Sequence, residues 1–195
     1  MDELTMYLLS IDWDYVTGDC QEFHTRCCGF CKESDGFYPS NNKKRGEVES
    51  IRLDWNKKLK ELKEIPVEFK TPIYVAECHA SIMEVVNAHS GPYEVMDFDA
   101  HYDRYRDGIL CCGNWIYHVE RLNGIVMKTP KVKCVDAVFF CRSSPWTPQN
   151  MDGKFYELIY NYCSRAKVEP RFIGHMRKSL RKTYQKLYGR QIATI

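Results

Sequence analysis

Short apolar runs and one-sided apolar stripes alternate along this chain of 195 residues. The runs have few polar positions, which is typical of strands buried on both faces of a parallel sheet; they cover residues 6–13, 71–76, 93–98 and 131–141. The stripes have helical spacing and predict helices over residues 49–64, 81–89, 112–121, 151–165 and 179–188. Because helical crossovers join parallel strands, this alternation predicts an α/β fold with three layers and a mostly parallel central sheet.

Ionisable residues follow three of the predicted strands. Asp12-Trp-Asp14 ends the first apolar run, His79 follows the second, and Asp99-Ala-His-Tyr-Asp103 follows the third. The carboxyl ends of parallel strands meet at one edge of a sheet, where ligands collect. Converging carboxylates repel each other unless a cation lies between them, although the alternative is a polar loop whose charges are solvated. Oxygen and imidazole groups without a thiol favour Mn²⁺, with iron or Zn²⁺ as alternatives. We therefore predict metal ligands at Asp12, Asp14, His79, Asp99, His101 and Asp103.

Length and composition describe one globular domain, residues 1–195, because no repeat or low-complexity linker divides the chain. The acidic N-terminus does not look like a secretory signal, so the ten cysteines are expected to be reduced thiols of a cytoplasmic protein. No apolar run approaches the about 20 residues that a membrane span needs, so no membrane partner is expected.

A cysteine-rich loop is predicted at residues 19–35. Its local set of Cys20, His24, Cys28 (or Cys27) and Cys31 has residue types that bind structural Zn²⁺. The alternative is a loop of reduced thiols without a metal.

A basic helix is predicted near the C-terminus, at residues 179–188. From residue 166 onward the chain carries eight basic residues and one acid, Glu169. Such a run forms either a solvated basic face or a docking surface for an acidic macromolecule, including nucleic acid.

The predicted ligand set resembles that of the arginase/deacetylase (ureohydrolase) superfamily, through Asp99-Ala-His101-Tyr-Asp103, the strand-end His79 and the separate Asp12-Trp-Asp14. Residues 74–79, 112–115 and 144–148 are most similar to the branch of peptide arginases, which convert arginine side chains to ornithine. The resemblance implies an arginase/deacetylase-like fold. It also implies a permuted strand order, because the Asp-x-Asp pair comes first in this chain and late in arginases.

The same resemblance implies two Mn²⁺ ions, or two ions of another divalent metal. One ion would be bound by His79, Asp99, Asp103 and Asp12, and the other by His101, Asp99, Asp12 and Asp14. A hydroxide between them would attack the substrate carbon. Where arginases have a helper histidine this chain has Ile116, so His118, two residues further on, is the candidate proton donor.

These residues predict a hydrolase that cleaves a C–N bond in arginine of a peptide or protein, or in a small guanidino compound. Trp115 and Trp146 would contact the substrate, because aromatic faces attract a guanidinium, and Asp97 or Glu77 would pair with it. One alternative is a mononuclear zinc deacetylase-like amidohydrolase, in which Asp14 has no role. Another is a zinc-containing nucleic-acid-binding module, although four converging carboxylates would repel phosphate.

Overall fold

The computed structural model describes residues 5–18, 55–105, 108–122, 124–128, 134–143, 147–174 and 177–192. Its strands are β1 (Met6–Asp12), β2 (Ile73–Ala76), β3 (Tyr93–Phe98), β4 (Ile125–Lys128), β5 (Ala137–Cys141) and β6 (Arg171–Phe172). Its helices are α1 (Trp13–Thr17), α2 (Trp55–Glu64), α3 (Ile82–Val86), α4 (Trp115–Arg121), α5 (Asp152–Ala166) and α6 (Arg177–Ile192). Two 3-10 turns, η3 (His79–Ser81) and η4 (Gln149–Met151), complete the described elements.

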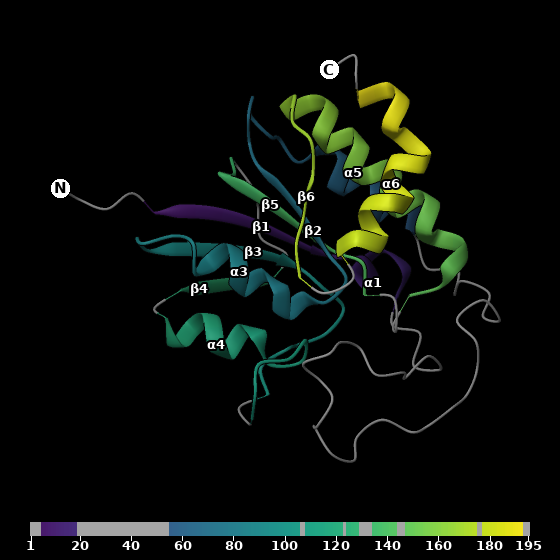
Figure 1. The fold of residues 1–195 in the computed structure, drawn as a ribbon. Coiled ribbons are helices and arrows are strands. Elements are labelled where there is room, and N and C mark those ends of the chain that lie inside the picture. Colours follow the sequence, from purple (N-terminus) through teal and green to yellow (C-terminus); the bar gives the residue numbers. More distant parts are fainter. Residues whose placement is uncertain are drawn as a thin grey trace.

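The six described strands form one sheet in the order β4-β3-β1-β5-β2-β6. Every pairing between them is parallel, so the predicted parallel sheet is confirmed. β1 lies near the centre, between β3 and β5, and its carboxyl end is therefore flanked by the carboxyl ends of both neighbours (Figure 1).

Helices cover both faces of the sheet. Leu9 and Ile11 of β1 pack with the buried residues of α2, α5 and α6, whereas Leu8 packs with those of α3 and α4. This alternation is what a strand buried on both sides requires, because successive side chains point to opposite faces. Figure 1 shows α5 and α6 on one side of the sheet and α3 and α4 on the other, as a three-layer α/β fold requires.

Several element boundaries differ from the prediction. Neither β4 nor β6 was predicted, because each is too short for a clear apolar pattern, and Ile125 and Met127 of β4 are exposed. The described part of the predicted strand 131–141 starts at Ala137. The helix predicted over 81–89 begins with η3 and ends at Val86, whereas α6 is longer than the predicted helix at both ends. Among the described residues, no helix combines the length and the apolarity that a membrane crossing needs.

Candidate metal centre

The candidate centre lies at the carboxyl ends of β1, β2 and β3. Asp12 is the last residue of β1, and Asp14 follows it in the first turn of α1, where the Asp14 amide donates to Asp12 Oδ1 over 3.2 Å. Asp99 directly follows β3 and begins the ligand loop, which we define as residues 99–103. His79 begins η3, after β2. The parallel sheet thus brings together residues that are far apart in the sequence.

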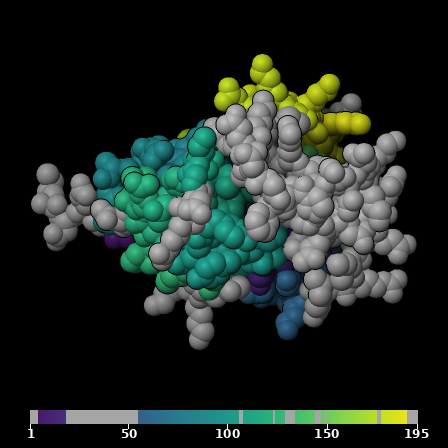
Figure 2. Space-filling model, turned by 90° about the horizontal axis from the view of Figure 1, so that it is seen from below, coloured from purple at the N-terminus to yellow at the C-terminus, as the bar shows by residue number. Residues whose placement is uncertain are grey.

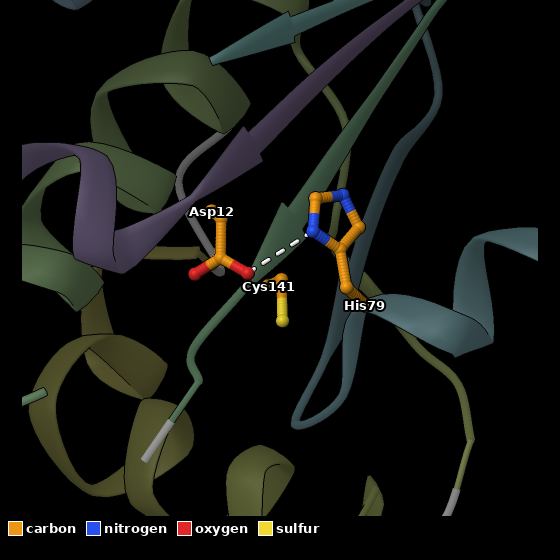
Figure 3. Close-up of side chains that lie close together, drawn as sticks. All are labelled: Asp12, His79 and Cys141. Atoms are coloured by element: carbon orange, nitrogen blue, oxygen red, sulfur yellow. Dashed lines mark ion pairs between the residues drawn. The ribbon is translucent and has the colours of Figure 1, made fainter. Parts of the chain in front are cut away.

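His79 points one ring nitrogen at three carboxylates. Its Nδ1 lies 3.0 Å from Asp12 Oδ2, 3.3 Å from Asp99 Oδ2 and 3.8 Å from Asp103 Oδ2. Its Nε2 lies 2.6 Å from Ser10 Oγ on β1. Figure 3 shows His79 and Asp12 facing each other. The hydroxyl of Ser10 holds one nitrogen, so the other faces the carboxylates.

The ring of His79 is held between two aromatic residues and is fully buried. The Trp115 ring on α4 stacks on it with a centroid distance of 4.2 Å, and the Phe139 ring on β5 lies 5.7 Å away. Trp115 also donates from Nε1 to Asp103 Oδ2 over 2.8 Å. One aromatic side chain therefore positions two of the predicted ligands.

His101 faces a second part of the same cluster. Its Nδ1 lies 2.7 Å from Asp14 Oδ2 and 3.7 Å from Asp99 Oδ1. The ligand loop is braced by the amide of Ala100, which donates to Asp14, and by the amide of His101, which donates to Asp99. The side chain of His101 is 29% exposed, whereas those of Asp14 and Asp99 are buried, so His101 marks the side of the centre that solvent reaches.

Burial and mutual repulsion shift the pKa values of the cluster, in the direction that a bound cation would oppose. Burial raises the pKa of both Asp14 and Asp103 well above the usual value, and neighbouring carboxylates raise it further. Burial opposes a charge on His79, but the carboxylates of Asp12 and Asp99 beside its ring outweigh that effect and raise its pKa well above the usual value. Without a metal these shifts favour the protonated forms of Asp14, Asp103 and His79.

Buried atoms without hydrogen bonds point into the cluster. Within the described part of the chain, His79 Nδ1, Asp14 Oδ2 and Asp99 Oδ2 are buried and make no hydrogen bond. Buried polar atoms are normally hydrogen-bonded, so atoms of this kind are available to coordinate a cation. The ligand atoms of Asp14, Asp99 and His101 lie within 4.8 Å of one another, as do those of Asp12, His79 and Cys141. These residues fit a divalent cation.

Comparisons of the chain with protein-family models, with curated proteins and with solved structures find no match. All six predicted ligands nevertheless meet in one place.

Cys141 is a neighbour that the sequence did not mark as part of the site. It ends β5 in register with Asp12, and Figure 3 shows its sulfur beside Asp12 and His79. Its Sγ lies 3.2 Å from Ser143 Oγ and 3.6 Å from the backbone oxygen of Glu77, to which it donates. Burial raises the pKa of this thiol well above the usual value. A metal deprotonates a thiol that coordinates it, so this raised pKa does not exclude Cys141 as a ligand.

Three expectations about the substrate pocket are corrected. Trp115 is fully buried, so it supports the ligands and offers no face to a substrate. Asp97 and Glu77 were expected to pair with a guanidinium, but both are buried beside the protein's own cations. Asp97 Oδ2 lies 2.7 Å from Lys128 Nζ, and Glu77 Oε2 lies 3.4 Å from Arg142.

The remaining candidates are not joined to the cluster. His118 lies on α4 beside Tyr117, with a ring distance of 5.8 Å, and among the described residues no hydrogen bond or ion pair connects it to the six ligands. Burial lowers its pKa, and Arg121 lowers it further. Its role as proton donor stays a prediction. Trp146 lies outside the described residues. So does the predicted zinc set of Cys20, His24, Cys28 and Cys31.

Proposed function

We propose that the chain is a metal-dependent hydrolase that cleaves a C–N bond, with the guanidino group of arginine in a peptide, a protein or a small molecule as substrate. The position of Asp99 carries this proposal. Its Oδ2 lies 3.3 Å from His79 Nδ1, and its Oδ1 lies 3.7 Å from His101 Nδ1. One carboxylate that faces two imidazoles can bridge two cations.

Two sets of residues on either side of Asp99 would hold the cations. His79 and Asp103 belong to the inner set, with Asp12 beside them. His101 and Asp14 belong to the outer set, at the solvent-accessible side. Oxygen and imidazole ligands favour Mn²⁺ among the divalent metals of proteins. When bound, two divalent cations lower the pKa of a shared water molecule and so supply a nucleophile near neutral pH.

The protein's own residues orient the centre and shield it from water. Ser143 donates to Asp12 Oδ2 over 2.6 Å and fixes that carboxylate. Trp115 and Phe139 stack on the His79 ring, and His101, whose side chain is 29% exposed, marks the side of the centre that solvent reaches. His118 remains the proposed source of the proton for the leaving amine, although burial lowers its pKa and so disfavours the imidazolium that would donate this proton.

The position of Asp14 favours two cations over a mononuclear zinc amidohydrolase. That alternative would leave Asp14 without a role. Asp14 is 1% exposed, and its Oδ2 lies 2.7 Å from His101 Nδ1. A carboxylate held there at the expense of its hydration fits a metal ligand better than a structural residue.

The proposal is tested by supplying arginine substrates. Metal-stripped protein is reloaded with Mn²⁺ and incubated with free arginine, an arginine-containing peptide and an acetyl-lysine peptide. Urea and ornithine should form with the wild type and with His89→Ala, whose histidine bonds the backbone of Pro92, but not with His101→Ala. Acetate from the acetyl-lysine peptide without urea from any arginine substrate would contradict the proposal in favour of a deacetylase.

A further inference from the structure

One buried carboxylate beside the centre is not among the six predicted ligands. Asp97 on β3 is fully buried and pairs in register with Ser10 on β1. Its Oδ1 lies 3.6 Å from His79 Nε2, the nitrogen that also faces Ser10. A buried carboxylate is unfavourable unless a cation compensates its charge. Asp97 thus needs a partner of its own, below the ligands at the strand ends.

Lys128 supplies that partner from the neighbouring strand. It is the last residue of β4 and is in register with Asp97. Its Nζ lies 2.7 Å from Asp97 Oδ2 and 3.6 Å from Asp99 Oδ2, and it donates to the backbone oxygen of His101. The ammonium therefore donates to one backbone oxygen and forms ion pairs with two carboxylates. A single cation therefore joins β3, the bridging carboxylate and the backbone of the second histidine.

The ammonium lies beside a group of side chains that could otherwise share a metal ion. The ligand atoms of His79, Asp97 and Asp99 lie within 4.8 Å of one another, which is close enough for a shared ion. Lys128 approaches the two carboxylates of that group. A built-in ammonium differs from a metal ion because the chain holds it in place whether or not other cations are present.

We propose that Lys128 is a permanent cation of the metal centre and acts as a positioning residue. It fixes the ligand loop through His101 and Asp99 and neutralises Asp97, which leaves the remaining carboxylates for the exchangeable metals. This inference rests on the proposed function, because it assumes that Asp99 and His101 bind metal.

Loss of the ammonium would act on the ligands rather than on the fold. Asp97 and Asp99 would become buried carboxylates without that ammonium, and their repulsion would displace the ligand loop. Arg104 still ties the chain beyond this loop to β4 through the backbone oxygen of Val126, at 3.4 Å. Changes in groups that orient metal ligands typically weaken metal binding by about 10–100-fold.

Metal binding by Lys128 variants tests the inference without reference to turnover. Mn²⁺ is titrated calorimetrically into metal-stripped wild type, Lys128→Met and Lys128→Ala, with Lys60→Ala as a control because the Lys60 side chain is 78% exposed. Lys128→Met keeps most of the packing but not the charge. We expect both Lys128 variants to bind Mn²⁺ at least about tenfold more weakly and Lys60→Ala to match the wild type.

Chemical rescue separates a cation from a packing role. Propylammonium matches the atoms that Lys128→Ala removes, and 1-propanol has the same shape without the charge. Propylammonium should restore Mn²⁺ binding by Lys128→Ala to within about threefold of the wild type, whereas 1-propanol should not. Wild-type affinity in Lys128→Met, or equal rescue by 1-propanol, would overturn the inference.

The design also distinguishes failure of the inference from failure of the proposed function. A wild type that binds no Mn²⁺ overturns the proposed function and the inference with it. A wild type that binds Mn²⁺ while Lys128→Met binds it equally well overturns the inference alone. Folding is checked by circular dichroism. If the Met and Ala variants do not fold, Lys128→Arg, which keeps a cation, decides the test: binding within about threefold of the wild type supports the inference and a larger loss overturns it.

Discussion

His79 shows how burial and charge determine the chemistry of one side chain. Its ring is stacked between Trp115 and Phe139, and its Nδ1 faces three carboxylates. Without a metal, a proton on the imidazole balances those charges, and for this reason its pKa is raised although burial opposes it. A divalent cation would replace that proton. The imidazole is therefore held in the orientation that a metal ligand needs.

Removal of the Ser10 hydroxyl should weaken metal binding. In Ser10→Ala, Nε2 of His79 loses the buried hydroxyl that lies 2.6 Å away, so the ring loses one of the contacts that orient it. We expect Mn²⁺ affinity to fall by about tenfold, measured by calorimetric titration. Ser179→Ala on the exposed face of α6 is the matched control and should bind as the wild type does. Unchanged affinity in Ser10→Ala would show that the hydroxyl does not orient the ligand.

The metal-free protein should lose stability as the pH rises. Burial raises the pKa of Asp97 from 3.8 to about 6, so between these values the folded state binds more protons than the unfolded chain. Asp14 and Asp103 have raised pKa values for the same reason and act in the same direction. His79, whose pKa is also raised, stabilises the fold below its unfolded pKa of 6.5 and loses this contribution as the pH rises through its folded value.

Thermal unfolding checks this pH dependence. With a chelator, the midpoint temperature of unfolding should decrease as the pH is raised from about 4 to about 8. Excess Mn²⁺ should reverse this decrease, because a cation replaces the protons of the cluster. A midpoint that rises with pH in the chelator, or does not respond to Mn²⁺ at the upper end, would contradict the cluster's electrostatics.

The elements differ in how far the sequence predicts them. β1 and β3 follow from long apolar runs, and the parallel sheet then requires their carboxyl ends to meet, so the convergence of Asp12 with Asp99 could be predicted. β4 has four residues with two exposed apolar side chains, and its place beside β3 depends on pairing between distant segments. The role of Lys128 therefore could not be predicted. Trp115 was wrongly expected to contact the substrate, because the apolar spacing of a helix does not show how deeply each of its side chains is buried.

The packing of α5 on α2 depends on a buried hydroxyl. Tyr162 on α5 donates to the backbone oxygen of Leu62 on α2 over 2.6 Å, and its ring is fully buried. Tyr162→Phe leaves that oxygen with the Ile65 amide as its remaining donor among the described residues and should lower the free energy of unfolding by about 0.5–1.5 kcal/mol in urea denaturation. Tyr105→Phe is the control, because Tyr105 is 76% exposed. Equal unfolding midpoints for the two variants would contradict a stabilising role for this bond.

At the scale of the whole molecule, the three layers separate the centre from a basic surface. The outer face of α6 exposes four cations that are part of the predicted docking surface: Lys178, Arg181, Lys182 and Lys186. Figure 2 shows the side chains of α6 along one border of the molecule. Leu180 and Tyr184 bury the opposite face of the helix. The order of the strands around the centre was not predicted, because it depends on which distant segments pair.

Neutralisation of the α6 cations should affect partner binding and leave the metal centre intact. We expect the fourfold glutamine variant to bind Mn²⁺ as the wild type does but to lose affinity for polyglutamate, a model acidic partner, at low ionic strength. Lys57→Gln with Lys60→Gln on α2 is the control for a general loss of positive charge. Equal binding of polyglutamate by wild type and variant at low salt would show that α6 is only a solvated face.

The number of metal ions bound per chain tests the central claim most directly. Metal-stripped wild type, Asp99→Ala and Asp136→Ala are reloaded with Mn²⁺, and the ions bound per chain are counted by elemental mass spectrometry. Asp136→Ala is the control, because Asp136 is an exposed residue next to β5. Because Asp99 faces both histidines, we predict two ions in the wild type and in Asp136→Ala, and the loss of both in Asp99→Ala. A wild type that binds no ion, or an Asp99→Ala variant that retains its full complement, would contradict a binuclear centre bridged by this carboxylate.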